Sequence, residues 1–449
     1  MAIVTVMGAA GTNVNVTVDG GDTLALANAY AKTLRESAAG KSFSTLQNGF
    51  NSASVGSSVG VITVGGAYAL DGAYVNIVAG ALSGGASASV LTTPVAIDAH
   101  EVTTPVDVIS GTLGGTTFLG GAAGGSFLAT AGDNVFIGGN GSFTINMGAG
   151  NDLVVTDHGN DTVNAGSGAN RIFLGDGSNS VNSMGTDTIV GTMGTQSVTI
   201  SAGSSLVLLG DNATVVDKAS HSIVSVGGGS TVSGGAQDMV SFTGTSGTIS
   251  GAVSDTISAA GNLQVTQGIG NTISVTGSLT FLNGTGMTSV VAGQSTIFGA
   301  AGLTMTLGAS GPTLFVANEG NETLDGAQAS SPLHAFADGG NVTFIGGSGN
   351  DTLVGGTGSA TMTGGSGDNL FAFTNGPSSG GDNVITDFGS AAGNMVALYQ
   401  YGYQNNNQLQ TILSAATIAG GNSTIQLTDN TRITFVGITD LKTSDFTLS

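Results

Sequence analysis

A nine-residue periodicity between Gly111 and Asn182 constrains the fold of this chain more than any other feature. Cut into nines from Gly111, the segment gives eight consecutive frames with no adjustment of spacing. The eighth position of every frame is apolar: Phe118, Phe127, Phe136, Ile145, Val154, Val163, Ile172 and Val181. The fourth position is glycine in seven of the eight frames: Gly114, Gly132, Gly141, Gly150, Gly159, Gly168 and Gly177. Two such columns indicate a repeat architecture and not ordinary globular domains.

The apolar column continues beyond this segment if steps of eight or nine residues are allowed. Its members are mostly β-branched or aromatic, which suits a half-buried pleated surface. They are Ile189, Val198, Val207, Val216, Val224, Val232, Val240, Ile249, Ile257, Val265, Ile273, Phe281, Val290, Phe298, Leu307, Phe315, Leu324, Leu333, Phe344, Leu353, Met362 and Phe371.

Each nine-residue unit predicts a short strand followed by a tight turn. The turn contains glycine because it needs a positive φ. Two units make a coil of ~17–18 residues, and coils stack at the strand spacing of ~4.8 Å. Side chains of the apolar column point inward, and stability comes from neighbouring coils. The pattern therefore predicts an all-β fold, a parallel β-roll or β-helix solenoid of about fifteen coils. The alternative is an irregular β-sandwich with glycine loops.

Three regions follow from where the repeat fits. Residues 1–110 fit poorly and predict a small mixed N-terminal cap or docking region, with a helix over Thr23–Ala38 and further strands over 43–110. Residues 111–372 form the solenoid, and residues 373–449 form a C-terminal β cap. An exposed solenoid end needs such a cap to block edge pairing.

The composition excludes several classes of binding partner and site. The 28 acidic residues against seven Lys and Arg give a net charge of −21, which argues against nucleic acid and anionic membranes. The chain has no cysteine, so disulfides and thiolate sites are excluded. No apolar stretch reaches the ~18 residues of a membrane span, and no cleavable N-terminal signal is recognisable.

One frame matches a known motif in full. Gly346-Gly347-Ser348-Gly349-Asn350-Asp351-Thr352-Leu353-Val354 has the pattern G-G-x-G-x-D-x-U-x. It resembles the RTX repeat family, whose β-roll turns clamp Ca²⁺ between sixth-position aspartates and backbone carbonyls. The resemblance implies a few calcium sites, with candidate ligands Asp351, Asn369, Asp368, Asp152 and Asp161.

The same residues have a second interpretation. Units two apart face each other, so Asp152 meets Asn134 and Asn170, while Asp161 meets Phe143 and Asn179. Most of the family's calcium array is therefore missing. Amides that hydrogen-bond along the stacking direction would instead form an asparagine ladder.

The C-terminus carries another resemblance. Asp382-Asn383-Val384-Ile385-Thr386-Asp387-Phe388 is similar to the block that follows RTX repeats. The end of the chain is similar to the uncleaved tail read by type I secretion systems, which implies a signal at Asp440, Asp445, Phe446 and Leu448. A plain final strand capping the solenoid is the other interpretation, and both can hold at once.

Enzymatic chemistry is not indicated. The four histidines are isolated, without the spacing of a zinc site. Glu319 and Glu322 read as two solvated turn acids, not as the paired carboxylates of a glycosidase. The alternation Tyr399, Tyr401, Tyr403 predicts three rings on one strand face.

We therefore expect no enzyme but a secreted structural protein that self-assembles into an extracellular filament, surface layer or biofilm-matrix fibre. The apolar, uncharged start of the chain is typical of an edge-seeking strand. The expected polymerisation residues are Ala2, Ile3, Val4, Thr5, Val6 and Met7. The partner is a second copy, with cell-surface or matrix polysaccharide as a further partner. The alternative is a calcium-dependent adhesin for polysaccharide or ice. Regular threonine columns would favour ice binding, but we expect the threonines to be scattered through the outward positions. A polysaccharide-acting enzyme is the weakest hypothesis.

Overall fold

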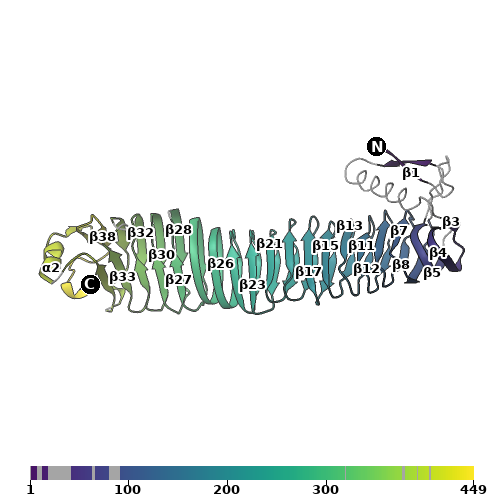
Figure 1. Ribbon diagram of the computed structural model, residues 1–449. Helices are drawn as coiled ribbons and strands as arrows, with labels where there is room; N and C mark the ends of the chain where they lie inside the picture. Colours follow the sequence, from purple (N-terminus) through teal and green to yellow (C-terminus); the bar gives the residue numbers. More distant parts are fainter. Residues whose placement is uncertain are drawn as a thin grey trace. The chain divides into compact units, whose positions relative to one another are not determined.

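The computed structural model describes residues 2–7, 13–18, 42–62, 66–79, 92–318, 320–376, 380–391, 393–403 and 406–448 (Figure 1). The described chain is an all-β parallel solenoid of about 16 turns. It divides into two compact units, Met1–Val226 and Gly227–Ser449. The all-β solenoid expected from the repeat is confirmed.

Unit 1 consists of short strands that pair in parallel with the strand one coil away. For example, β10 pairs with β8 and β12, while β11 pairs with β9 and β13. Even-numbered strands from β6 to β20 thus form one sheet face, and odd-numbered strands from β7 to β19 form the other. The strands are β1 (Ala2–Met7), β2 (Asn13–Val18), β3 (Ser42–Thr45), β4 (Gly49–Ile62), β5 (Gly66–Ala79), β6 (Val95–Val102), β7 (Val106–Ser110), β8 (Thr116–Leu119), β9 (Gly125–Ala129), β10 (Val135–Ile137), β11 (Phe143–Asn146), β12 (Leu153–Val155), β13 (Thr162–Gly166), β14 (Arg171–Phe173), β15 (Ser178–Ser183), β16 (Thr188–Gly191), β17 (Thr195–Ile200), β18 (Leu206–Leu209), β19 (Thr214–Asp217) and β20 (Ile223–Val226).

The interior of unit 1 is the predicted apolar column. All eight eighth-position residues from Phe118 to Val181 are buried. Phe118, Phe127, Phe136 and Phe143 pack in stacked and edge-to-face contacts, with ring centroids 5.2–6.4 Å apart. The nine-residue period therefore predicted which side chains form this core.

The fourth-position glycines are required where coils touch at the turns. Gly168 has φ +124°, and a Cβ placed there would lie 1.9 Å from the carbonyl oxygen of Gly150. No side chain fits at that distance, and this backbone conformation disfavours L-residues. Stacking of coils at the turn thus depends on glycine.

Unit 2 continues the same alternation of parallel strands within its own body, with one uninterrupted strand, β26, that spans several coils. The strands are β21 (Ser230–Gly234), β22 (Met239–Phe242), β23 (Ser246–Ser250), β24 (Thr256–Ala259), β25 (Asn262–Thr266), β26 (Thr272–Leu307), β27 (Thr313–Val316), β28 (Gly320–Asp325), β29 (Leu333–Phe336), β30 (Gly340–Ile345), β31 (Thr352–Val354), β32 (Ser359–Thr363), β33 (Leu370–Thr374), β34 (Asp382–Ile385), β35 (Met395–Tyr399), β36 (Thr417–Ala419), β37 (Asn422–Gln426), β38 (Arg432–Phe435) and β39 (Phe446–Leu448).

The C-terminal end of unit 2 is capped. The helix α2 (Asn406–Ser414) and the antiparallel pair β36–β37 lie at this end (Figure 1), next to the short 3₁₀ turns η1 (Phe388–Ser390) and η2 (Thr443–Asp445). β37 also pairs antiparallel with β38, which continues the parallel ladder from β34. The polar residues Asn406 and Asn407 begin the helix α2.

Two members of the predicted apolar column are wrong. Val216 and Phe298 point outward, and the adjacent Val215 and Ile297 are the buried residues. The cause is a difference in coil length. Val198 pairs with Val215, 17 residues on, where the predicted column had a step of 18 to Val216. Ile297 pairs with Phe315, 18 residues on, where the predicted column had a step of 17 from Phe298. A shift of one residue moves a side chain to the other face of a strand.

The solenoid extends beyond the predicted boundaries at 110 and 372. Parallel pairing begins at β3 and β4 and runs through β38 and β39. The predicted helix over Thr23–Ala38 lies outside the described residues. β1 pairs antiparallel with β2 and forms a separate two-stranded sheet.

In the parts of the chain that are described, no helix combines the length and the hydropathy of a membrane span.

Candidate cation-binding turns

Buried Asn and Asp side chains form a ladder along the inner side of the unit 1 turns. The backbone N–H of Asn134 donates to Oδ1 of Asp152 at 2.7 Å, and that of Asp152 donates to Oδ1 of Asn170 at 2.9 Å. The N–H of Asn170 continues the series to Oδ1 of Asp187 at 3.0 Å. Each sixth-position oxygen therefore binds the preceding coil, and the coils are held in register at the turn.

The asparagines of this ladder occupy a position suited to a cation. Nδ2 of Asn134 donates to the carbonyl oxygens of Gly132 at 2.6 Å and Ala131 at 3.4 Å, and to Oδ1 of Asp152 at 3.0 Å. Oxygens on several sides are the surroundings that Ca²⁺ takes in proteins. Here the partly positive amide hydrogens fill the place, so no metal is needed at Asn134.

Asp152 and Asp161 lack such compensation. Both are almost completely buried, and Oδ2 of each has no hydrogen-bond partner among the described residues. Burial raises the pKa of the Asp152 carboxyl to about 6, against the lowering effect of its hydrogen bonds from Asn134. Burial also raises the pKa of the Asp161 carboxyl, against the lowering effect of the hydrogen bonds from the Phe143 N–H and the Thr156 hydroxyl. An uncompensated buried carboxylate is costly, so both positions fit a bound cation.

The ligands for such a cation would be mainly carbonyl oxygens. Across the described ranges, no three carboxylate or imidazole groups converge on one point. By coil register, Ala149 stacks on Ala131, so the turn carbonyls preceding Asp152 correspond to those around the Asn134 amide. Asp152 would hold the ion with its free Oδ2, and Ca²⁺ would supply the charge that the carboxylate lacks. This donor set is the kind that oxygen-seeking Ca²⁺ accepts.

The turn around Asp351 differs from this arrangement. Asp351 stacks on Asn369, as the spacing predicted, and its N–H donates to Oδ1 of Asn369 at 3.0 Å. Both Asp351 oxygens are already engaged, Oδ1 by the Leu333 N–H at 2.8 Å and Oδ2 by the Gly347 N–H at 3.0 Å. Burial still raises the pKa of this carboxyl. At the turn that matches the motif best, each carboxylate oxygen of Asp351 thus already accepts a backbone hydrogen bond.

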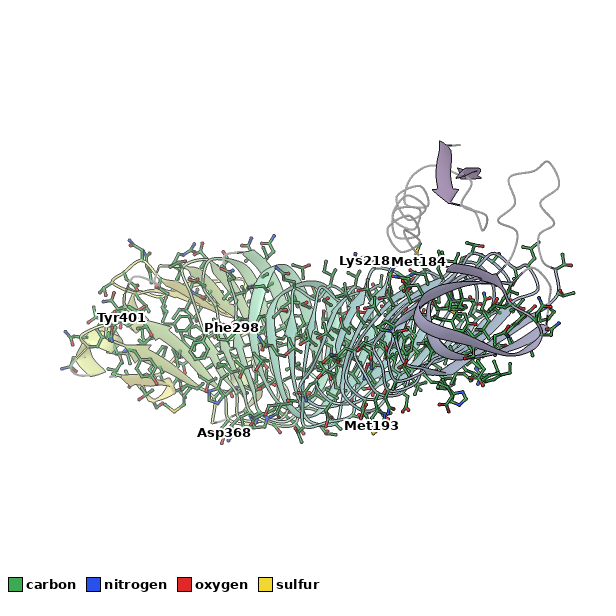
Figure 2. All side chains as sticks on the ribbon, turned by 45° about the vertical axis from the view of Figure 1, so that its right-hand side comes forward. Met184, Met193, Lys218, Phe298, Asp368 and Tyr401 are labelled. Carbon is green, nitrogen blue, oxygen red and sulfur yellow. The ribbon has the colours of Figure 1, made fainter. Side chains whose placement is uncertain are left out.

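Asp368 lies apart from these buried residues. It is exposed on the outside of its coil (Figure 2), where its N–H donates to Oδ1 of Asn350 at 2.9 Å. It therefore belongs to an outer ladder, in which fifth-position side chains accept hydrogen bonds from the following coil. Asp133 and Asn151 do the same in unit 1, with Asp133 Oδ1 accepting from the Asn151 N–H at 2.8 Å.

Unit 2 contains a second inner ladder, which was not predicted from the sequence. The N–H of Asp238 donates to Oδ1 of Asp255 at 2.9 Å, and the N–H of Asp255 donates to Oδ1 of Asn271 at 2.8 Å. Both aspartates are buried. Successive members of this ladder are 17 and 16 residues apart. They therefore do not fall on the same position of a nine-residue repeat. The detectable signal was an Asp or Asn two residues before each apolar-column member.

Glu322 corrects another expectation. It was expected to be a solvated turn acid, but its side chain is buried. Oε2 accepts the Asn318 N–H at 2.7 Å, while Oε1 has no partner among the described residues. Burial raises the pKa of this carboxyl. Glu319 lies outside the described residues.

The three tyrosines do not share a strand face. β35 ends at Tyr399, which is partly exposed, and Tyr401 is buried near the C-terminal end of unit 2 (Figure 2). Tyr401 and Tyr403 stack with ring centroids 5.6 Å apart, and the Tyr401 hydroxyl donates to Oδ2 of Asp429 at 2.8 Å. The rings therefore belong to the C-terminal cap.

The residues of the expected secretion signal are folded into that cap. Phe446 is buried and packs edge-to-face on Phe435, and β39 pairs in parallel with β35. Oδ2 of Asp445 accepts the Lys442 N–H at 2.8 Å. The final strand therefore completes the solenoid, and its role in export stays a prediction.

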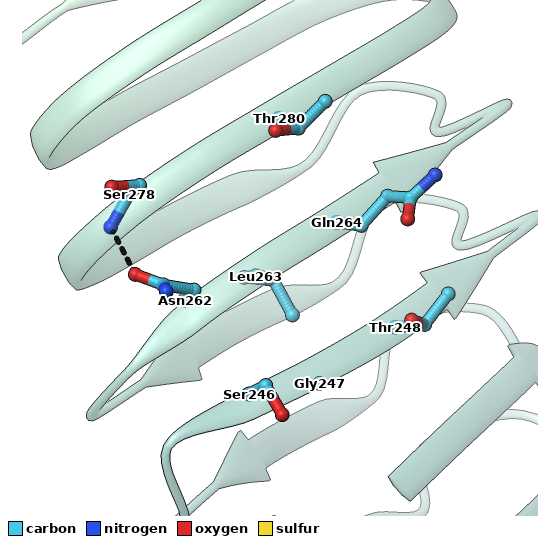
Figure 3. Close-up of a pocket in the computed structure, with 8 residues that line it drawn as sticks. All are labelled: Ser246, Gly247, Thr248, Asn262, Leu263, Gln264, Ser278 and Thr280. Carbon is cyan, nitrogen blue, oxygen red and sulfur yellow. Dashed lines mark hydrogen bonds between the residues drawn. The ribbon is translucent and has the colours of Figure 1, made fainter. Parts of the chain in front are cut away.

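Polar side chains line an open depression on β23, β25 and β26 of unit 2 (Figure 3). Its volume is about 320 Å³. Thr248, Gln264 and Thr280 follow one another in register across the three strands. The lining is uncharged: Ser246, Gly247, Thr248, Asn262, Leu263, Gln264, Ser278 and Thr280.

Threonines that are scattered in the sequence form a column in unit 2. Thr304, Thr323, Thr343 and Thr361 are successive register partners on β26, β28, β30 and β32. The expectation of no regular threonine column was therefore wrong for this part of the chain.

The fold and the ladders place the protein in the class of parallel β-solenoids whose coils are joined at the turns by hydrogen bonds to buried Asn and Asp side chains. Residues 146–181, 335–362 and 345–376 match the family model of the RTX calcium-binding nonapeptide repeat, in four copies. The chain thus carries RTX repeats, and such repeats bind calcium. The first matched segment contains Asp152 and Asp161, and the others contain Asp351. No curated protein matches the chain significantly.

Proposed function

We propose that this protein is a secreted structural protein that assembles into an extracellular filament, surface layer or biofilm-matrix fibre, with calcium bound at a few turns. RTX repeat proteins are typically secreted, and their solenoids are typically structural or adhesive. Calcium in the extracellular medium would neutralise the buried carboxylates of Asp152 and Asp161 and would stiffen the stack of coils.

The main observation in support of assembly is the separate two-stranded sheet of β1 and β2. Val4 lies opposite Val16 and Val6 opposite Val14 in a sheet of only two strands. Such a hairpin is marginally stable alone. Pairing within the same chain, with β2, occupies one edge of β1. Its other edge pairs with no described strand, and main-chain hydrogen bonds to another copy would satisfy it.

A matching edge exists on the solenoid itself. The first half of β4, Gly49–Ala53, pairs on one side with β5 and has no partner on its other side among the described strands. Strand edges of this kind pair with other chains unless covered. A hairpin-to-edge contact between copies is heterologous and does not close, so it generates filaments.

A proline within β1 tests this contact. Val4→Pro removes a backbone donor and should abolish growth in light scattering, while the melting temperature of the solenoid stays unchanged. Val4→Thr keeps the strand and should assemble like the wild type. Equal growth of Val4→Pro and wild type would show that β1 is not the contact.

A second candidate, a calcium-dependent adhesin for neutral polysaccharide, is favoured by the uncharged depression around Gln264. Amide and hydroxyl groups in register suit sugar hydroxyls. Affinity electrophoresis in neutral glycans should show retardation of the wild type that Gln264→Ala reduces. Identical mobility of the two proteins would reject this site.

A further inference from the structure

The coils of unit 1 from β8 to β20 present two outward faces of different character, whereas on β6 the register partner of Leu119 is Asp98. On the even-numbered strands, one outward column runs in register through Leu119, Ile137, Val155, Phe173, Val190 and Leu208. All six members are apolar, and they are consecutive from β8 to β18. The second outward column is mixed and holds Val135, Leu153, Leu206 and Ile223 together with Thr117, Arg171 and Thr188. We call these two columns the apolar face.

The opposite face of the same coils is polar. Thr144, Thr162, Ser180, Ser197 and Thr214 form one outward column of the odd-numbered strands. Asn146, Asn164, Asn182 and Thr199 lie in the other, which ends at the apolar Val216. Nδ2 of Asn164 donates to Oδ1 of Asn146 at 2.8 Å. The apolar outward residues of unit 1 are therefore concentrated on the even-numbered strands and do not simply reflect the composition of the unit.

Members of the apolar face remain accessible in the single chain. Ile223 is 47% exposed, and Ile137 and Leu208 are each 36% exposed. Among the outward positions of β8 to β20 the one charged residue is Arg171, whose guanidinium lies over the Phe173 ring at 5.5 Å. A continuous apolar patch of this kind marks an interaction site.

We propose that the apolar face of unit 1 docks against the apolar face of a second copy of this chain, side by side. The inference deepens the proposed function and rests on it, because it adds a lateral contact to the end-to-end one.

Three features on the face favour a second copy as the occupant. Its apolar side chains recur at the coil spacing of ~4.8 Å, which an identical parallel solenoid matches, and two such sheets pack ~10 Å apart. It carries no carboxylate at its outward strand positions, so two copies meet there without the repulsion that a net charge of −21 produces elsewhere. Its first column is apolar and unbroken over six strands, so the same contact between two copies can repeat from coil to coil.

The size of the face fits a lateral contact within an assembly. Seven strands of about four residues give a face of roughly 450 Å² per copy, from spacings of ~4.8 Å between strands and ~3.3 Å along them. A pair would bury about 900 Å², just under the ~1,000 Å² of a stable interface. The contact is therefore weak between two free molecules and strong when many copies are already aligned in a filament.

The test uses the full-length chain and a triple substitution in the unbroken column, Val155→Thr, Val190→Thr and Leu208→Thr. The matched control changes the polar face of the same coils, Ser180→Thr, Ser197→Thr and Thr199→Ser. Sedimentation velocity should show self-association of the wild type and the control, weakened at least tenfold in the column variant. Electron micrographs should show bundled filaments for the first two and single filaments of unchanged length for the variant.

Hydroxyl-radical labelling of the wild type supplies a measurement that does not depend on a variant. Phe173 and Leu208 should be labelled in dilute solution and protected at high concentration. Protection at both concentrations would mean that a segment of the same chain covers the face, and labelling at both would mean that nothing docks there. Either result overturns the proposal.

The outcomes separate this inference from the proposed function. Filaments that bundle equally in wild type and column variant overturn the lateral contact and leave the proposed function standing. Side-by-side dimers without filaments support the apolar face and contradict the proposed function. A wild type that is monomeric at all concentrations overturns both.

Discussion

The side-chain amide of Asn134 donates a hydrogen bond to Oδ1 of Asp152 one coil away, at 3.0 Å, while Oδ2 of Asp152 has no partner among the described residues. Amide and carboxylate thus alternate along the inner ladder of unit 1. Asp187 has hydrogen bonds to both of its oxygens, from Asn170 and from the Ser183 hydroxyl. Asp152 leaves one buried oxygen that a proton or a cation must satisfy.

The first prediction concerns the pH dependence that follows from Asp152. Its pKa is about 6 in the folded chain, against 3.8 for an ordinary aspartate. Between these values the folded state binds more protons than the unfolded state, so stability falls as pH rises through this window. In chelator, Asp152→Asn should match the wild type below about pH 4 and should be more stable at pH 7, by about 1–3 kcal/mol.

Thermal unfolding across pH 4 to 8 measures this difference. Asn151→Ala, at the exposed neighbouring position, is the control and should show no change in pH dependence. A pH-independent difference between Asp152→Asn and wild type would contradict the assignment.

The second prediction is that calcium acts through Asp152 and Asp161. Calcium should raise the melting temperature of the wild type because it binds the folded state. The double variant Asp152→Asn, Asp161→Asn should lose most of this shift, whereas Asp351→Asn should keep it, because both Asp351 oxygens are engaged by N–H groups. Calorimetric titration counts the sites. Loss of the shift in Asp351→Asn alone would place the ion elsewhere.

The third prediction tests coil register in unit 2. Phe315 is fully buried, and Phe298 is 43% exposed. Phe315→Ala should destabilise the chain by about 3–5 kcal/mol because it opens a cavity in the core. Phe298→Ala should cost less than about 1 kcal/mol. Denaturant unfolding of both variants measures the difference, and equal losses would mean that the register is wrong.

The fourth prediction concerns the turns. Gly168→Ala should destabilise unit 1 by about 2–4 kcal/mol, since Cβ meets the Gly150 carbonyl in a backbone conformation that alanine disfavours. Ser167→Ala, at the exposed preceding position, should be neutral in the same thermal melt.

The fifth prediction concerns export. Deletion of residues 439–449 should retain the protein in the cell. Gly168→Ala, which destabilises the fold but keeps the tail, should still be exported. Immunoblotting of cells and medium distinguishes the two, and normal secretion of the deletion would exclude a C-terminal signal.

The sequence predicted most of the side chains that form the core. It did not predict which buried carboxylate oxygens lack a hydrogen-bond partner. A strict nine-residue period places Phe136 and Val154 inside without any structural knowledge. The period fails at Val216 and Phe298, where coils of other lengths change which of two adjacent apolar residues faces inward. Hydrophobicity alone does not distinguish Phe298 from Ile297.

Stacking of Asp152 on Asn134 and Asn170 also followed from spacing. The spacing did not predict which carboxylate oxygens lack a hydrogen bond, because this depends on backbone N–H groups of neighbouring coils. Those groups engage both oxygens of Asp351 and one of Asp152. The buried state of Glu322 was equally hidden, since its flanking glycine and asparagine are typical of an exposed turn.

Electron microscopy of the purified full-length protein, in calcium and in chelator, tests the central claim most directly. The account predicts filaments of stacked solenoids in calcium and shorter or fewer filaments in chelator. A protein that stays monomeric in calcium at every concentration would contradict it.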